Sequence, residues 1–368
     1  MSKFDVMKWL LFNSGPIIRF RTMTDLLASN DIQEVSKAIE DVLSSQMVEQ
    51  WLPQLNNGIG FEDIHSSNPE SIENTLYKLG QLGMKAGFQP FDSHTLAYRV
   101  WLSDRISSPA VSFHEQLMRT IMAASLANAG YGNISPVQAV LKSRLETIAR
   151  FVSSFDSKNI YADSSEYEIP KARSNWKLIN PVLYRESSFP LPWIHDLVGV
   201  AKVQDFRNDS SSVRKINSVC KAILRDEYQE LPTGYGLVRE HGRYYVSGWS
   251  VHLPYFERFT DGKGDSHDML DGAKLLLWLE LLSPLPVICQ SDWFQNAVLF
   301  LEIYRTRYDT YIFPREWLRE KGSGYWINGA YMAFQRGGRN RKVIECESTF
   351  RMLKLKHQAR LSRASGVS

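Results

Sequence analysis

The stretch that decides the fold is WLLFNSGPIIRFRTMTDLL, residues 9–27. An apolar segment that begins near Phe4 stops at Ser14-Gly15, and Pro16 then opens a second segment. Glycine suits the turn, and proline suits the first position of a helix, where its missing N–H costs nothing. One face of the second segment carries, at helical spacing, Ile17, Phe20, Thr24 and Leu27. The stretch therefore predicts two consecutive helices joined by a tight turn.

Similar helix starts recur along the first 150 residues. Asn30-Asp31 precedes an amphipathic run over residues 32–43, and residues that commonly cap helices stand at Asn68, Asp92, Ser112 and Ser135. The two serines are each followed three residues later by Glu or Gln, which predicts capping boxes. Alternate starts lie 43 to 44 residues apart. This period is typical of stacked helical hairpins, in which each hairpin covers the apolar face of its neighbour.

The helical pattern fails between Phe155 and Phe189, where the sequence is compatible with a linker, a long loop or an irregular hairpin. Helical spacing resumes near Pro190 and in four later runs, Ser212–Leu224, Met269–Leu282, Trp293–Arg305 and Glu345–His357. We therefore predict an all-α fold with regular hairpins over residues 1–150, an aromatic-rich half over residues 190–357 and a frayed tail over residues 361–368.

The composition of the chain excludes several classes of protein. Its 368 residues are 43% hydrophobic, and 43 basic against 40 acidic residues give a net charge of +3, which predicts no nucleic-acid partner. The basic run 336–342 is predicted to be a solvated turn, with a phosphate contact as the alternative. The apolar runs are too short for a membrane span or a signal peptide. We expect a cytoplasmic protein with three buried thiols and without a metal or cofactor.

Three acidic residues are candidate proton donors: Asp196, Glu280 and Asp268. Glu280 lies in the apolar run 275–282, where a carboxylate would either hold a proton or pair with an arginine of a neighbouring helix. Asp268 lies between Asp265 and Asp271, and their spacing fits either Mg²⁺ ligation or the capping of the next helix. Two histidines could move protons, because an imidazole titrates near neutral pH: His195 and His252.

Aromatic residues gather in the second half of the chain, where their rings could line a cavity, hold an apolar ligand and stabilise positive charge. The alternative for any single ring is packing over a turn. The predicted lining comprises Trp193, Tyr244, Tyr245, Trp249, Trp293, Tyr325 and Trp326. Arg305 and Arg315 would orient polar groups of the ligand. Phosphate-loop, dinucleotide-binding and nucleophile-elbow motifs are absent from the sequence.

With these features, the chain resembles the squalene-cyclase and prenyltransferase-like α/α-toroid superfamily. The resemblance rests on the opening stretch 9–27, on the hairpin repeats and on SGYWINGAYM, residues 323–332. It implies a single α/α toroid over residues 1–360 that encloses an apolar cavity. The cyclases' Asp-x-Asp-Asp motif and the prenyltransferases' zinc ligands have no counterpart here, so no catalytic residue is carried over.

The resulting hypothesis is a toroid that binds an apolar, isoprenoid-like small molecule and cyclises or isomerises it after protonation. Two alternatives stay open. Stacked hairpins also form surfaces that bind a protein partner without catalysis. An α/α-barrel enzyme that acts on glycosides would use paired carboxylates, for which Asp196 with Glu280 or Glu302 are candidates.

Overall fold

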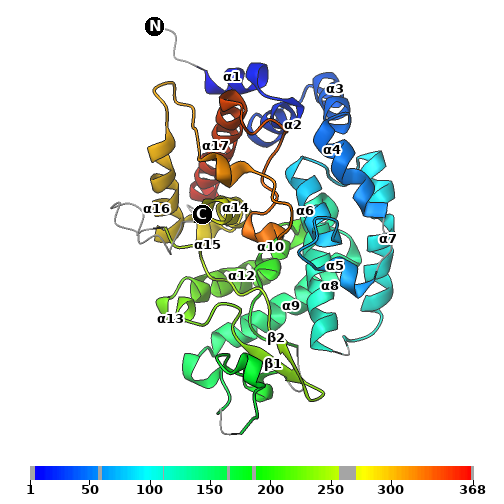
Figure 1. Ribbon diagram of the computed structural model, residues 1–368, viewed down its shortest axis with the longest axis vertical. Coiled ribbons are helices and arrows are strands. Elements are labelled where there is room, and N and C mark those ends of the chain that lie inside the picture. Colours follow the sequence, from blue (N-terminus) through cyan, green and yellow to red (C-terminus); the bar gives the residue numbers. More distant parts are fainter. Residues whose placement is uncertain are drawn as a thin grey trace. The chain divides into compact units, whose positions relative to one another are not determined.

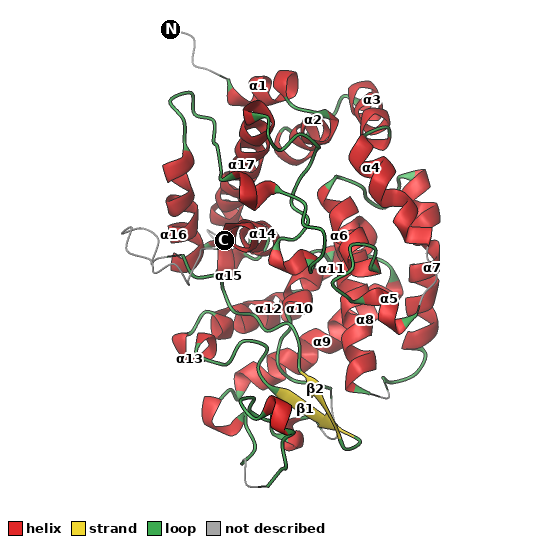
Figure 2. Cartoon of the chain, in the orientation of Figure 1, coloured by secondary structure: helices red, strands yellow, loops and turns green. Residues whose placement is uncertain are grey.

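The computed structural model describes residues 5–56, 60–110, 112–163, 166–184, 188–256 and 271–365. Its contacts divide the chain into two compact units, the first made of Met1–Ala97 and Pro254–Ser368, the second of Tyr98–Leu253. Both units are mainly helical, as predicted (Figure 2). The helix α7 (Gln89–Ile106) runs from the first unit into the second.

The first unit, unit 1, contains helices from both ends of the chain. Its α-helices are α1 (Val6–Asn13), α2 (Pro16–Arg21), α3 (Ile32–Leu43), α4 (Gln46–Trp51), α5 (Phe61–Ile64), α6 (Ile72–Gln81), α14 (Gly272–Leu282), α15 (Pro286–Cys289), α16 (Asp292–Leu301) and α17 (Arg341–Ser365). A π-helical turn, η1 (Thr22–Leu26), extends α2. The short 3₁₀ turns are η2 (Leu52–Asn56), η8 (Glu302–Tyr304), η9 (Arg315–Leu318) and η10 (Trp326–Asn328). The predicted pair of helices at residues 9–27 is thus confirmed as α1 and α2.

The last helix, α17, is the centre of unit 1. It packs against α1, α2, α14, α15 and α16, so the red end of the chain lies beside the blue start (Figure 1). Phe350 and Leu355 are buried on α17, and the thiol of Cys346 lies 3.5 Å from the carbonyl oxygen of Asn13 at the end of α1. The three cysteines are free and buried, as predicted. Apolar contacts on α17 therefore join segments that are far apart in the sequence.

The second unit, unit 2, is built on the helices α8 (Phe113–Leu126), α9 (Ser135–Ser153) and α10 (Ile194–Val200), which contact one another, and on α12 (Ser210–Ile223), which packs against α9. Shorter elements surround them, namely η3 (Ala127–Tyr131), η4 (Ser157–Asn159), η5 (Lys171–Arg173), η6 (Pro181–Leu183), α11 (Gln204–Asn208) and α13 (Asp226–Gln229). The predicted break in helical structure at residues 155–189 is confirmed, because only short 3₁₀ turns and loops are described there.

One small sheet departs from the predicted all-α fold. Strands β1 (Leu237–Glu240) and β2 (Arg243–Val246) pair in antiparallel register, with Glu240 opposite Arg243 (Figure 2). The two turn residues, His241 and Gly242, have positive φ angles of 47° and 77°. Positive φ at both turn positions is typical of tight two-residue hairpins, because it matches the twist of the strands.

The structure corrects three of the predicted helix caps. Asn68 forms a turn, and Ser71 caps α6 instead. Asp92 lies within the first turn of α7 and accepts the Gly87 N–H at 3.1 Å. Ser135 is the first residue of α9 rather than its cap. Each start lies next to a proline, which is compatible with more than one position of the first helical turn, so the spacing alone did not identify the cap.

Two other predicted caps are confirmed. Asp31 accepts the Glu34 N–H at 2.9 Å at the start of α3, and Ser112 accepts the Glu115 N–H at 3.1 Å at the start of α8. The closure of the hairpins into an α/α toroid over residues 1–360 stays a prediction. Among the described residues, no helix is both long and apolar enough to cross a membrane.

Candidate functional site

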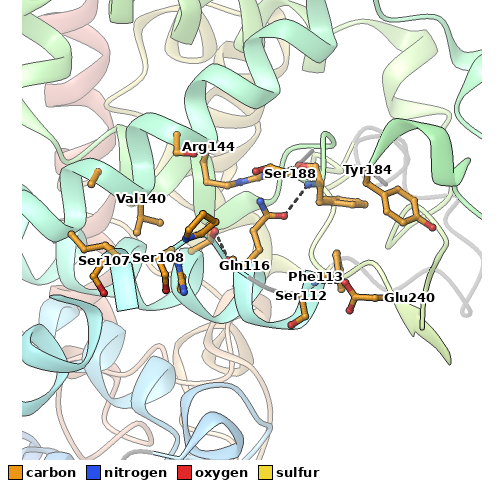
Figure 3. A pocket seen from close by; sticks show the side chains of 18 residues that line it. Ser107, Ser108, Ser112, Phe113, Gln116, Val140, Arg144, Tyr184, Ser188 and Glu240 are labelled. Carbon is orange, nitrogen blue, oxygen red and sulfur yellow. Dashed lines mark hydrogen bonds between the residues drawn. The ribbon is translucent and has the colours of Figure 1, made fainter. Parts of the chain in front are cut away.

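A pocket of about 780 Å³ lies in unit 2, beside the N-terminal end of α8. Its walls come from the end of α7, from α8 and α9, from Tyr184, Ser188 and Phe189, and from the end of β1 (Figure 3). The apolar and aromatic lining comprises Ile106, Pro109, Ala110, Phe113, Ala139, Val140, Tyr184 and Phe189. The polar lining comprises Ser107, Ser108, Ser112, Gln116, Arg119, Thr120, Ser143, Arg144, Ser188 and Glu240. The pocket therefore has both apolar surface and many hydrogen-bonding groups.

The start of α8 is held by two side chains from the pocket wall. Ser112 caps the helix, and the carboxylate of Glu240 accepts the N–H of Phe113 at 2.8 Å. The first N–H groups of a helix have no partner within the helix, and they carry partial positive charge. The contact thus holds the end of β1, and with it Glu240, at the N-terminal end of α8.

Aromatic rings cluster beside this helix start. The ring centroids of Phe113 and Phe189 lie 5.2 Å apart in an edge-to-face arrangement, and Tyr184 lies 6.4 Å from Phe189. The side chain of Gln116 accepts the backbone N–H of Phe189 at 2.8 Å, which ties the loop to α8 (Figure 3). Edge-to-face pairs add to the stability gained from apolar burial.

Both arginines of the pocket wall are ion-paired. Arg119 contacts Glu115 at 2.5 Å and donates to the carbonyl oxygen of Ser108 at 2.8 Å. Arg144 is buried and contacts Asp196 through Nε at 2.9 Å and through Nη2 at 2.8 Å. A two-point contact of this kind is among the strongest that a carboxylate makes with a side chain.

Asp196 is wholly enclosed by the elements that it connects. In addition to Arg144, its carboxylate accepts the N–H of Trp193 at 2.8 Å, which closes the first turn of α10. The Arg144 guanidinium also donates to the carbonyl oxygens of Phe189 and Leu191 and lies 4.3 Å from the Trp193 ring. These contacts favour a structural role for Asp196. Its buried carboxylate joins α10 to α9 through the ion pair with Arg144.

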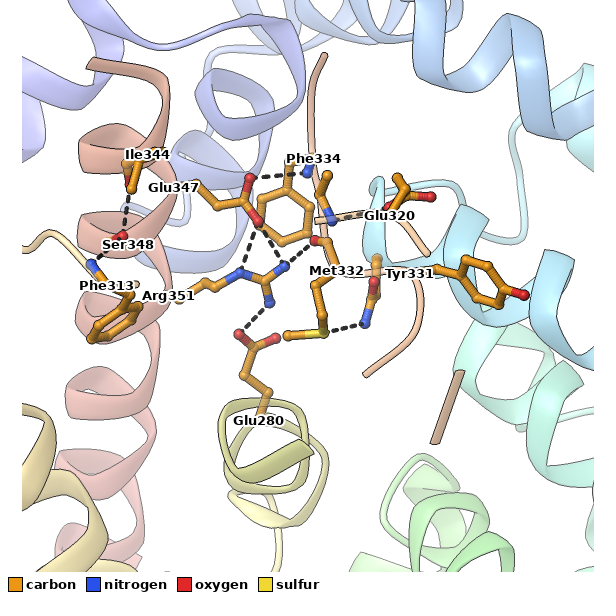
Figure 4. A network of polar contacts seen from close by, with 12 residues as sticks. Glu280, Phe313, Glu320, Tyr331, Met332, Phe334, Ile344, Glu347, Ser348 and Arg351 are labelled. Carbon is orange, nitrogen blue, oxygen red and sulfur yellow. Dashed lines mark hydrogen bonds and ion pairs between the residues drawn. The ribbon is translucent and has the colours of Figure 1, made fainter. Parts of the chain in front are cut away.

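Glu280 has a similar environment in unit 1 (Figure 4). It accepts from Arg351 of α17 at 2.6 Å, and Arg351 also contacts Glu347 at 3.0 Å. Burial raises the pKa of Glu347, although the Arg351 charge opposes this shift. The predicted alternative for Glu280, an ion pair with an arginine of another helix, is confirmed.

The same network continues to a buried lysine. Lys78 of α6 contacts Glu320 at 2.5 Å and the backbone oxygens of Tyr331 and Ala333. Burial lowers the pKa of Lys78, and the charge of Glu320 opposes this shift. All three protons of the ammonium group are therefore accounted for by protein acceptors.

The other candidate residues are distributed over both units. In unit 2, His195 and Trp193 are buried at the start of α10, and His252 contacts the Ser250 hydroxyl and the Leu231 carbonyl oxygen, each at 2.6 Å. Tyr244 and Tyr245 lie on β2, and the carbonyl oxygen of Trp249 accepts the Ile194 N–H at 3.0 Å. None of these described residues lines the pocket.

In unit 1, the indole of Trp293 donates to the Pro254 carbonyl oxygen at 3.1 Å. Arg305 is exposed and pairs with Asp309 at 2.8 Å, and Arg315 is exposed on η9. Tyr325 stacks on His65 with centroids 5.0 Å apart, and Trp326 stacks on Tyr77. Asp268, Asp265 and their loop lie outside the described residues.

The residues that line the pocket were not predicted from the sequence. Phe113 and Gln116 lie on α8, Glu240 ends β1, and the three residues show no motif of their own. The available signals were the Ser112 cap, which placed a helix start at the pocket, and the unusual density of tyrosines in residues 155–189. Neither signal shows that β1 would bring a carboxylate to the start of α8.

Among the described residues, no group of three His, Cys, Asp or Glu side chains could hold a metal ion. Comparison of the chain with protein-family models, with curated proteins and with solved structures gave no match.

Proposed function

We propose that the protein binds a small amphipathic molecule with an apolar, isoprenoid-like body in the pocket at the start of α8. The observation that supports this proposal is the lining of the pocket, in which an aromatic and aliphatic wall meets a set of hydroxyl and amide groups. The volume of about 780 Å³ falls within the range of small-molecule sites, about 300 to 1,000 Å³.

The proposal assigns binding rather than proton-initiated cyclisation to this pocket. Such a cyclisation needs an acid that holds a proton near the substrate. Asp196 and Glu280 each accept hydrogen bonds from an arginine, so both carboxylates are engaged by partners within the protein. The proposal therefore keeps the binding of an isoprenoid-like molecule from the sequence-based hypothesis and assigns no proton donor.

Filling the pocket tests the proposal. Ala139 and Ser143 lie one helical turn apart on α9, line the pocket and are exposed, so a tryptophan at either position would occupy the hollow without entering the core. Binding of geraniol and farnesol would be measured by calorimetry for the wild type and for Ala139→Trp and Ser143→Trp. We expect both variants to lose at least about tenfold in affinity, equivalent to about 1.4 kcal/mol.

The matched control is Ser153→Trp, which adds the same ring at an exposed position of α9 outside the pocket. It should bind like the wild type. Absence of binding by the wild type, or equal binding by the filled variants, would contradict the proposal. Mass spectrometry of molecules that copurify with the wild type but not with Ala139→Trp would extend the test to ligands outside this series.

A further inference from the structure

The described lining of the pocket includes three charged side chains, and two of them form ion pairs within the protein. Arg119 is neutralised by Glu115 at 2.5 Å, and Arg144 by Asp196 at 2.8 Å, in both cases within the protein. Glu240 accepts one backbone N–H, but among the described residues no Lys, Arg or His lies within ion-pair distance of its carboxylate. Among the described residues that line the pocket, Glu240 is therefore the charged side chain without an ion pair.

The two arginines that neighbour Glu240 in the hairpin form no ion pair with its carboxylate. Arg239 precedes it on β1, and its guanidinium lies 5.6 Å from the centre of the Tyr167 ring. Arg243 is opposite Glu240 in the register, but its side chain is exposed and makes no ion pair with Glu240. The Glu240 carboxylate, which is only partly exposed, thus keeps an oxygen for a ligand.

The carboxylate lies at the aromatic end of the pocket. Figure 3 shows Glu240, Phe113 and Tyr184 together on one side of the hollow. The Tyr184 hydroxyl accepts the backbone N–H of Arg239 at 2.9 Å, which holds the ring beside the end of β1. Burial raises the pKa of the Tyr184 hydroxyl, the backbone N–H and the charge of Arg239 oppose this rise, and the negative charge of Glu240 adds to it. Both observations put the carboxylate close to the aromatic wall.

A carboxylate beside aromatic rings recognises organic cations. The carboxylate supplies a charge-assisted hydrogen bond to an ammonium group, and aromatic rings attract a cation through their negative faces. The same surroundings disfavour an anionic head group, because like charges repel. A bare metal ion would need further oxygen ligands, and the described residues offer no such group of side chains.

We propose that the ligand of this pocket carries an amine or another organic cation, which Glu240 binds at the aromatic end while the apolar body lies along α8 and α9. This inference rests on the proposed function, because it names the head group of the same ligand.

Three probes with one apolar body test it, namely geranylamine, geraniol and geranic acid. We expect the wild type to bind the amine about tenfold more tightly than the alcohol at low salt, and the acid most weakly. Glu240→Gln keeps the acceptor for the Phe113 N–H but removes the charge. This variant should bind the amine and the alcohol with nearly equal affinity.

Glu230→Gln is the matched control, because it removes the same charge from an exposed position of unit 2 outside the pocket. It should keep the preference for the amine. Tyr184→Leu removes one ring and should weaken binding of the amine more than that of the alcohol. The preference should also fall as salt is added, since a partly exposed charge pair is screened.

The outcomes separate the two proposals. Equal affinities of amine and alcohol in the wild type, with no effect of Glu240→Gln, would overturn the cationic head group and leave the pocket as the binding site. Binding of all three probes that is insensitive to Ala139→Trp would overturn the proposed function itself. Absence of binding by every probe would overturn both.

Discussion

The two units contain a similar buried arginine, and the one in unit 2 lines the pocket beside α8. In unit 1, Arg351 contacts Glu280 and Glu347, and the network around it is closed by Lys78 and backbone oxygens (Figure 4). In unit 2, Arg144 pairs with one carboxylate among the described residues, that of Asp196, and lines the hollow beside α8 (Figure 3). The comparison teaches that the same kind of ion pair can be part of a core or of the wall of a pocket. The difference lies in whether the arginine packs only against protein groups or also lines a hollow.

The largest effect is expected for Arg351→Met. The change leaves two buried carboxylates without their cation, and breaking a buried pair costs about 3 to 5 kcal/mol. Urea unfolding followed by circular dichroism would measure the loss. Arg360→Met, at an exposed position of the same helix, is the control and should unfold like the wild type. A loss below about 1 kcal/mol would contradict a structural role for this network.

Arg144→Met should have the next largest effect on stability, about 3 kcal/mol, because a single carboxylate loses its partner. It should also weaken binding of geraniol, since Arg144 belongs to the pocket wall and holds the loop at Phe189 through its carbonyl oxygen. Arg150→Met, exposed on the same helix, is the control for both measurements. Destabilisation without any change in binding would show that the wall of the pocket does not depend on this pair.

Glu280→Gln sharpens the comparison, because it tests whether the unit 1 network contributes to ligand binding. Arg351 keeps Glu347 as its partner, so we expect a loss of about 1.5 to 3 kcal/mol in stability, the range for a hydrogen bond to a charged group. Calorimetry should find geraniol bound as in the wild type. A loss of binding in a folded Glu280→Gln protein would show that Glu280 contributes to ligand binding.

The smallest effect concerns an ion pair of unit 1 that is more exposed. Asp25 contacts Arg21 at 2.8 Å, and although burial acts in the opposite direction, the charges of Arg21 and Lys354 hold its pKa below the usual value of 3.8. A carboxyl whose pKa is lowered by folding contributes stability above its unfolded pKa and loses it as the pH falls. Asp25→Asn should therefore cost about 1 kcal/mol at pH 7 and less with each step below about pH 4. Urea midpoints measured across this range would check the trend, and a constant difference would contradict it.

Much of the fold could be predicted from local patterns. Pro16 after Gly15, the Asp31 cap and the apolar spacing of residues 32–43 each depend on neighbours within a few positions, and the structure has the corresponding helices. The β1–β2 hairpin was missed although His241-Gly242 is a possible two-residue turn. Tyr244 and Tyr245, which follow the turn, are predicted as cavity lining, and that interpretation overlooks the strand pattern.

The candidate site was much harder to predict. The sequence indicated that Glu280 would be paired, because an unpaired carboxylate within an apolar helix is costly, but it could not identify Arg351, which lies 71 positions later. No such signal marked Asp196, and its partner Arg144 lies 52 positions earlier in the sequence. Residues that line the pocket belong to four separate stretches of the sequence and follow no shared spacing.

The sequence by itself determined that the protein is mainly helical and where most of its helices lie, because helix formation depends on caps, turns and spacing within one or two turns. Only the tertiary structure decided that Arg144 would neutralise Asp196 and that Glu240 would reach the start of α8. Those contacts join residues 52 and 127 positions apart, and their formation depends on how the elements pack. The proposal of a cationic ligand depends on these contacts.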